Sequence, residues 1–208
     1  VGPSGRRHIK SMTRIILASK SASRRALLEG AGVPFEAVGS GVDEDVIKEE
    51  EKAKGSSPVA IALALAKAKA LAVNGTPDDL VIGGDQVLDF ENTLYDKPKT
   101  MEEAVDRLTA MAGHTHYLRG ALCLAQGGEV VWSHEETSAL TMRKASREEV
   151  EAYLHSVGDR VLRTVGAYEL EGPGVRLFEK IEGDYFSILG LSLLPLLDAL
   201  RARGVLPW

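Results

Sequence analysis

The chain of 208 residues contains a single cysteine, few aromatic residues and no long hydrophobic run. Because Cys123 has no second cysteine to pair with, an intramolecular disulfide framework is excluded, which fits a reducing cytoplasm. No run approaches the roughly 20 apolar residues of a membrane helix, and no pattern of basic start, apolar run and small-residue cleavage site indicates secretion. We therefore expect a cytoplasmic protein without a membrane partner.

An excess of positive charge is also absent. The formal net charge is −5, so no global basic field attracts nucleic acid, and an aromatic share of 5% is low for a surface that stacks single-stranded bases. A local basic pocket for a small polyanion remains compatible with this balance. No P-loop, HExxH or nucleophile elbow is present. We therefore expect a small-molecule partner and no nucleic acid.

Hydrophobic periodicity begins only after residues 1–11. We interpret these residues as a disordered lead of artificial origin, with Met12 as the natural start, and residues 12–208 as a single domain with one core or two lobes. Alternating and apolar runs predict strands, and capped amphipathic segments, including capping boxes at Thr100 and Ser146, predict helices. The predicted strands are 14–18, 34–38, 79–84 (running into 85–88), 116–125, 129–142 and 175–181, and the predicted helices are 23–29, 57–73, 100–111, 146–155 and 191–203. The mixture predicts an α/β fold with a mixed, twisted β-sheet and flanking helices.

The segment 17–25 joins a buried strand to a helix through a turn rich in hydroxyl groups. Ser19, Ser21 and Ser23 can cap the helix or bind an anion, and the free N–H groups and the positive end of the helix dipole point to the same place. Two arginines, of which Arg24 is the first, can fork onto phosphate oxygens. The alternative is an ordinary N-cap followed by solvated arginines. The pattern favours a phosphate site, with Arg24 on a solvated first turn.

A second group of polar residues has the chemistry of a metal and phosphate site. Asp85 directly follows the apolar strand 79–84, whose last two residues are glycines that let a ligand approach the backbone. The alternative for this carboxylate is a cap on a turn. The acidic cluster 43–45, otherwise a solvated loop, could supply an oxygen ligand for Mg²⁺, which takes one or two protein carboxylates plus phosphate. Lys67 and Lys97 are candidate charges for a triphosphate or, alternatively, ordinary surface lysines.

Eight ordered blocks of sequence carry a resemblance to one family. They are LASKSASRRALLEGAGVPFE, VDED, LALAKAKA, IGGDQV, DKPKT, LTAMAGHTH, VGAYELEGPG and FEKIEGDYFSILGLSL. In this order and spacing they resemble the Maf (septum formation inhibitor) family over residues 14–205. The resemblance implies a nucleoside triphosphate pyrophosphatase, which cleaves between the α- and β-phosphates and releases a monophosphate and pyrophosphate. It also implies two lobes around a central cleft, similar to inosine triphosphatases, and is compatible with a homodimer.

The resemblance also implies roles for individual residues. Asp85 matches the family's catalytic aspartate, a proton acceptor beside a divalent metal (Mg²⁺ or Mn²⁺), and Glu44 matches a metal-site glutamate. Four further residues match the polar shell around the phosphates: Ser19, Arg24, Lys67 and Lys97. A metal held by Asp85 and Glu44 would polarise a phosphate oxygen and lower the pKa of an attacking water. The cationic side chains would offset the developing charge.

Three positions are associated with base preference in this family: Ser23, Gln86 and Glu171. Gln86 and Glu171 resemble the subgroup that acts on 7-methyl-GTP, and a carboxylate suits the donors of a guanine edge. Ser23 departs from that subgroup, which tends to have tryptophan there, and residues 165–168 (VGAY) resemble the thymidine type. We therefore expect a modified or non-standard nucleotide, with 7-methyl-GTP favoured. The alternatives are a pyrophosphatase that prefers dTTP or UTP, and a nucleotide-binding regulator of septum formation that needs no turnover.

Overall fold

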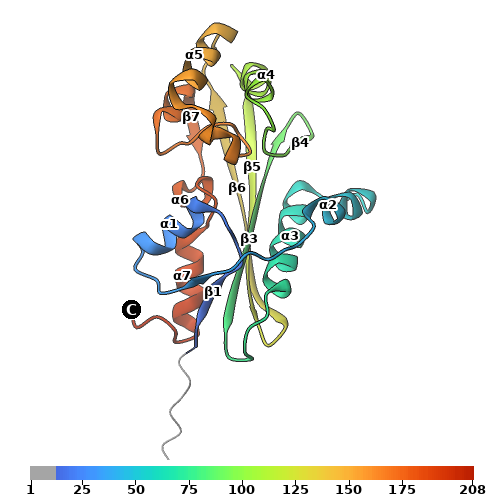
Figure 1. Cartoon of the computed structure of the whole chain (residues 1–208), viewed down its shortest axis with the longest axis vertical. Helices are drawn as coiled ribbons and strands as arrows, with labels where there is room; N and C mark the ends of the chain where they lie inside the picture. The colour runs from blue at the N-terminus through green and yellow to red at the C-terminus, as the bar shows by residue number, and fades with distance from the viewer. Residues whose placement is uncertain (1–12) are drawn as a thin grey trace, which may run out of the picture.

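The computed structural model describes residues 13–208 and shows helices on both sides of a long twisted sheet (Figure 1). The interpretation of residues 1–11 as a lead and of Met12 as the start lies outside the described residues. Seven strands form one sheet in the order β2-β1-β3-β5-β6-β7, with β4 beside β3. Parallel and antiparallel pairs both occur, so the predicted α/β fold with a mixed sheet is confirmed.

The elements follow one another with short connections. The strands are β1 (Ile15–Leu17), β2 (Glu36–Ala37), β3 (Leu80–Phe90), β4 (Thr93–Tyr95), β5 (Thr115–Gln126), β6 (Glu129–Met142) and β7 (Phe178–Glu182). The α-helices are α1 (Ala22–Gly30), α2 (Glu44–Ala53), α3 (Pro58–Ala72), α4 (Met101–Met111), α5 (Arg147–Val157), α6 (Tyr185–Ile188) and α7 (Leu193–Ala202). Two 3₁₀ helices are η1 (Asp159–Arg163) and η2 (Pro173–Leu177). Within residues 13–208, every helix is too short or too polar to cross a bilayer.

The two neighbours of β3 on one side leave part of its edge uncovered. β1 runs parallel to the start of β3, and this ladder ends with Leu17 opposite Ile82. β4 joins β3 only from Leu88 onward. Among the pairings of the described residues, the edge of β3 between these two ladders has no strand beside it. This open stretch, residues 83–87, lies in the middle of the sheet.

Helices cover both faces of β3, which is why the strand is apolar along most of its length. Leu80 and Ile82 pack against apolar side chains of α1 and α7, whereas Val81 packs against Ala66 of α3 on the other face. A Cβ atom at Gly83 would lie 2.0 Å from the Ala66 carbonyl oxygen, so the glycine lets α3 approach the sheet. Figure 1 shows α3 on one side of β3 and α1 and α7 on the other.

A separate hydrophobic cluster surrounds the far end of the sheet, where α4 and α5 pack (Figure 1). Leu88 and Phe90 of β3 belong to this cluster, whereas Leu80 and Ile82 belong to the one beneath α1 and α7. The open stretch of β3 therefore lies between two groups of helices that have different cores. This is the arrangement expected of two lobes.

The far cluster encloses one polar pair. His116 is fully buried, and its Nε2 atom lies 2.8 Å from the hydroxyl of Tyr168. Its Nδ1 atom has no hydrogen-bond partner within the part of the chain that the structure describes. Burial lowers the pKa of His116 to about 4, so the imidazole is neutral at pH 7.

Three segments differ from the sequence-based predictions. The acidic residues 43–45, expected in a loop, begin helix α2, where the Asp43 carboxylate caps the first turn. Residues 175–177, expected in a strand, belong to η2. The capping box at Ser146 is confirmed, but Glu103, expected to complete the other box, accepts from the N–H of Lys99 at 2.6 Å instead. In each of these three segments the local sequence suits both the predicted and the observed hydrogen bonds, and contacts with the rest of the fold decide between them.

Candidate active site

Asp85 lies in the open stretch of β3, opposite Ala121 of β5. The sequence placed it at the end of a strand; β3 instead continues to Phe90, and what ends before Asp85 is the ladder with β1. The residue is only 8% exposed. Burial raises the pKa of its carboxyl group, against the opposing effect of Lys69 and Arg24. Asp85 is therefore a carboxylate poised to gain a proton more readily than an exposed aspartate.

One lysine joins this carboxylate to a second one. Lys69 Nζ lies 2.6 Å from Asp85 Oδ1 and 2.8 Å from Glu44 Oε1. The Lys69 side chain is 9% exposed, like that of Asp85, whereas the Glu44 side chain is 44% exposed. Glu44 begins α2 and Asp85 lies in β3, so α3 brings an ammonium group between two elements far apart in sequence. The two carboxylates predicted as a pair are thus brought together.

Lys67, the lysine chosen from the family resemblance, points elsewhere. Side chains two residues apart on a helix diverge by about 200°, so Lys67 and Lys69 leave α3 in nearly opposite directions. The charge of Lys67 acts instead on the buried thiol of Cys123. Sequence reasoning did not single out Lys69, the lysine that contacts both Asp85 and Glu44. The assignment of Lys67 to the phosphates stays a prediction.

Further lysines surround Glu44. Lys48, one turn along α2, bonds Asp96 at 2.5 Å, and its side chain is 14% exposed. Burial opposes ionisation of Glu44, but Lys69, Lys48 and Lys97 together hold its pKa below the ordinary value. Lys97, predicted for the phosphates, is exposed and lies close enough to act on Glu44 in this way. Lys48 was not predicted, although its i, i+4 spacing from Glu44 is a signal that could have found it.

Arg24 is buried rather than solvated, which corrects the sequence-based expectation. It is 9% exposed, and its Nε atom donates to the carbonyl of Gly190 at 2.7 Å. Its Nη1 atom lies 3.4 Å from the Ser19 hydroxyl. Burial lowers the pKa of Arg24, with Asp85 and Glu44 opposing. The guanidinium therefore belongs to the same charge group as the two carboxylates and also anchors α1.

The serines of the same segment organise the start of α1. The Ser21 hydroxyl accepts from the Arg24 N–H at the N-cap, and it lies 3.0 Å from the Ser23 hydroxyl. The Ser19 hydroxyl accepts from the Ser21 N–H at 3.1 Å. The predicted helix start is confirmed, and its hydroxyl groups converge beside Arg24.

Gln86, a predicted base-selecting residue, is held by the segment that also holds Arg24. Its Nε2 atom donates to the Ser187 carbonyl at 2.8 Å. Ser187 belongs to α6, and Gly190 follows this helix with a φ of +108°, a backbone conformation that favours glycine. Residues 187–190 thus accept hydrogen bonds from both predicted groups.

Glu171, the other predicted base-selecting residue, is exposed between η1 and η2. Its charge acts on the hydroxyl of Tyr153, and no hydrogen bond or ion pair among residues 13–208 joins it to Gln86. Arg107, which no sequence signal indicated, contacts the loop that contains Asp96 and the loop that contains Val165. Its Nη1 atom donates to the carbonyls of Asp96 and Val165 at 2.5 Å each, so it ties the loop before Lys97 to the loop before Glu171.

The donor set suits a divalent metal that brings part of its own coordination shell. Asp85 and Glu44 offer carboxylate oxygens, and both contact one cation, the ammonium of Lys69. Within the described residues, no group of three or more His, Cys, Asp or Glu side chains could hold a metal. Mg²⁺ commonly takes one or two protein carboxylates together with waters and substrate phosphates. The residues therefore fit a metal that is completed by a phosphate-bearing ligand.

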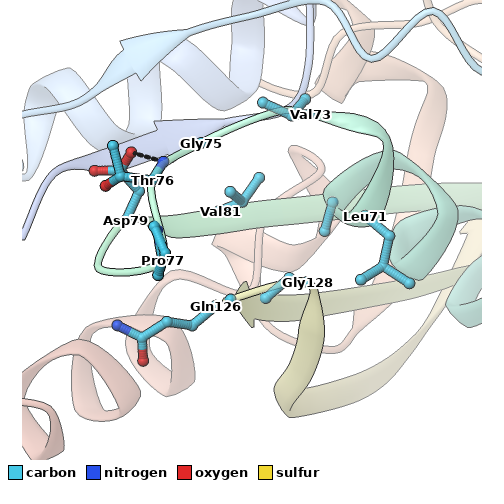
Figure 2. A pocket seen from close by; sticks show the side chains of 12 residues that line it. Leu71, Val73, Gly75, Thr76, Pro77, Asp79, Val81, Gln126 and Gly128 are labelled. Atoms are coloured by element: carbon cyan, nitrogen blue, oxygen red, sulfur yellow. Dashed lines mark hydrogen bonds between the residues drawn. The ribbon is translucent and has the colours of Figure 1, made fainter.

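Two cavities of the described part of the chain lie away from this charge group. One, of about 180 Å³, lies where α3 ends and β3 begins (Figure 2). Its carboxylate, Asp79, accepts from the Thr76 N–H at 2.7 Å and is paired with Arg14 at the same distance. The other, of about 300 Å³, lies between α5 and η2. Neither is lined by Asp85, Glu44 or Lys69, so the candidate site is identified by its charges and not by these cavities.

Comparisons with known proteins identify the family to which the chain belongs. A family model described as Maf-like protein matches residues 14–203. A nucleoside triphosphate pyrophosphatase of Hyphomonas neptunium is 47% identical over 193 residues, which cover 93% of this chain and 98% of the relative. A 7-methyl-GTP pyrophosphatase of Rhizobium meliloti is also 47% identical over 193 residues, covering 92% and 97%. A nucleoside triphosphate pyrophosphatase of Caulobacter vibrioides is 46% identical over 196 residues, covering 94% and 98%.

Proposed function

Because the chain belongs to the Maf family, we propose that it is a metal-dependent nucleoside triphosphate pyrophosphatase. Its substrate is a modified or non-standard nucleotide, with 7-methyl-GTP favoured, and its products are the monophosphate and pyrophosphate. The names of the relatives from Hyphomonas and Rhizobium support this assignment. The buried thiol of Cys123 is compatible with a reducing cytoplasm.

The observation that carries the proposal is the charge group of buried Asp85 and Lys69 with half-exposed Glu44, and Arg24 beside it. A protein that only binds a triphosphate has no need to place two carboxylates, one of them buried, among its phosphate-binding cations. An enzyme that activates water does need them, because a carboxylate must accept a proton and help to hold a metal.

The chemistry follows from these groups. Water attacks the α-phosphorus, a new P–O bond forms, and the bond from this phosphorus to the bridging oxygen breaks, so that pyrophosphate leaves with that oxygen. Asp85 accepts the proton of the attacking water, which its raised pKa favours. Arg24 and Lys97 hold phosphate oxygens and offset their charge. Asp85 and Glu44 would hold Mg²⁺ or Mn²⁺, which when bound polarises a phosphate oxygen and lowers the pKa of water.

Base preference rests on Gln86 and Glu171. A carboxylate accepts from the N1–H and N2–H₂ donors of guanine and also attracts the cationic ring of 7-methylguanine, whereas thymine and uracil present acceptors to it. Ser23 supplies a hydroxyl group and no stacking ring. Residues 165–168, with the thymidine-type sequence VGAY, support the alternative preference for dTTP or UTP.

A substrate panel tests the proposal. Purified protein with Mg²⁺ or Mn²⁺ is mixed with canonical and methylated triphosphates, and pyrophosphate release is measured. We expect release from 7-methyl-GTP at a higher kcat/KM than from dTTP or UTP. Faster turnover of dTTP or UTP would refute the preference for 7-methyl-GTP but would support the pyrophosphatase reaction. The absence of pyrophosphate release across the panel would refute the reaction itself.

A further inference from the structure

Lys69 occupies the place between the two carboxylates that were predicted to hold a metal. Its Nζ atom is within 2.8 Å of both Glu44 and Asp85, and its side chain is as buried as that of Asp85. Asp85 and Glu44 have no second lysine or arginine within ion-pair distance in the described part of the chain. One ammonium group therefore neutralises both sides of the site.

The charge balance of the site is complete without a metal. Two cations, Lys69 and Arg24, face two carboxylates, Asp85 and Glu44. Lys48 is paired with Asp96, and Lys97 acts on Glu44 from an exposed position. A divalent cation would add two positive charges against an ammonium group that contacts the same oxygens. Like charges at about 4 Å repel strongly at a partly buried site. A ligand that carries several negative charges removes this conflict, because it offers Lys69 and Arg24 other oxygens.

We propose that Lys69 acts as a placeholder cation: it holds Glu44 and Asp85 together in the nucleotide-free protein, keeps divalent metal affinity low, and moves its ammonium group to phosphate oxygens when a metal–triphosphate complex enters. The proposal rests on the proposed function for the identity of the ligand. It explains why α3 directs a lysine, rather than an apolar side chain, at a buried carboxylate. It also makes the metal and the nucleotide enter together.

Two binding measurements with opposite expected signs test the placeholder. Free Mn²⁺ is measured by electron paramagnetic resonance during titration of nucleotide-free protein, and binding of metal-free tripolyphosphate is measured by calorimetry. Lys69→Met keeps most of the side-chain volume and removes the charge. We expect it to tighten Mn²⁺ binding about ten-fold or more and to weaken tripolyphosphate binding about ten-fold.

The matched control is Lys52→Met, which removes an exposed charge from α2, the helix that carries Glu44. It should leave both dissociation constants within about two-fold of the wild type, because exposed pairs are screened. If Lys69→Met binds Mn²⁺ no more tightly than the wild type, the placeholder role is overturned. If its affinity for tripolyphosphate is unchanged, the transfer to phosphate is overturned.

Folding of the variant supplies a second measurement. Lys69→Met leaves two carboxylates close together without their shared cation, so its Tm should fall and should recover on addition of Mn²⁺. Failure of Mn²⁺ to stabilise the variant more than the wild type would contradict the proposal. None of these readouts depends on turnover. An inactive protein that passes them would refute the proposed reaction alone, and an active protein that fails them would refute only the placeholder.

Discussion

Replacement of Arg24 by alanine should lower both activity and stability, because this residue anchors α1 and is proposed to bind phosphate. The guanidinium is buried beside Asp85 and Glu44, and it also donates to the Gly190 carbonyl at 2.7 Å. Alanine removes the proposed phosphate contact and leaves the partly buried Gly190 carbonyl without this donor. A solvated arginine on the first turn of α1 would have affected activity alone.

The magnitudes follow from the contacts. A hydrogen bond to a charged group contributes about 1.5–3 kcal/mol, so loss of one phosphate contact should lower kcat/KM about 10- to 150-fold. Loss of the bond to Gly190 should reduce the free energy of unfolding by about 2 kcal/mol. For a chain of this size that corresponds to a fall in Tm of about 4–8 °C. The bond to Ser19, at 3.4 Å, adds little.

The assay combines steady-state pyrophosphate release with thermal unfolding followed by circular dichroism. Arg25→Ala is the matched control, because Arg25 is the exposed neighbour on the same turn. Its Tm should stay within about 2 °C of the wild type. An Arg24→Ala variant with an unchanged Tm would refute the anchoring of α1 to Gly190. An unchanged kcat/KM with a lowered Tm would show that Arg24 is structural and does not hold phosphate.

Three other changes test the site and the core. Asp85→Asn should lower kcat about 10²- to 10⁴-fold with an unchanged circular dichroism spectrum, and activity within a few-fold of the wild type would remove Asp85 from the reaction. Gln86→Thr combined with Glu171→Gln should raise the ratio of kcat/KM for dTTP to that for 7-methyl-GTP; an unaltered ratio would remove both residues from base selection. Because the folded pKa of His116, about 4, lies below the unfolded value of 6.5, the unfolded chain binds the extra proton as the pH falls through this range. The free energy of unfolding, measured with urea, should therefore fall by about 2 kcal/mol between pH 7 and pH 5. His116→Phe should abolish this pH dependence, and His114→Gln, at an exposed position, should keep it. The same pH dependence in the wild type and both variants would show that another group titrates.

The order of elements was predictable where local signals agree. The cap formed by Ser57 with proline at the next position predicts the start of α3, and the structure confirms it. The capping box at Ser146 does the same for α5. Helix α2 was missed because most of its residues are charged, so no apolar stripe marks it. Only the cap by Asp43 signals this helix, and the same pattern also suits a solvated turn.

The sequence pattern of α3 explains why Lys69 was not singled out. Helix α3 has two stripes at i, i+4 spacing that each contain two apolar residues and one lysine. The first is Ile61, Leu65 and Lys69, and the second is Leu63, Lys67 and Leu71. The two are equivalent by composition, so periodicity cannot decide which one faces the sheet. The choice depends on the close contact of α3 with Gly83, which buries the first stripe and leaves Leu71 46% exposed.

The contacts of α6 connect the two ends of the proposed substrate. The carbonyls of Ser187 and Gly190 accept from Gln86 and Arg24, so the proposed base-selecting side chain and the proposed phosphate-binding side chain depend on one short segment. Threonine at position 86 has no side-chain N–H to donate to Ser187, and a shift of α6 would move the acceptor of Arg24. The swap at positions 86 and 171 should therefore lower kcat/KM for every triphosphate in addition to changing base preference. Because this shared loss cancels between substrates, the ratio of kcat/KM values isolates base recognition, whereas the absolute rates also report the position of Arg24.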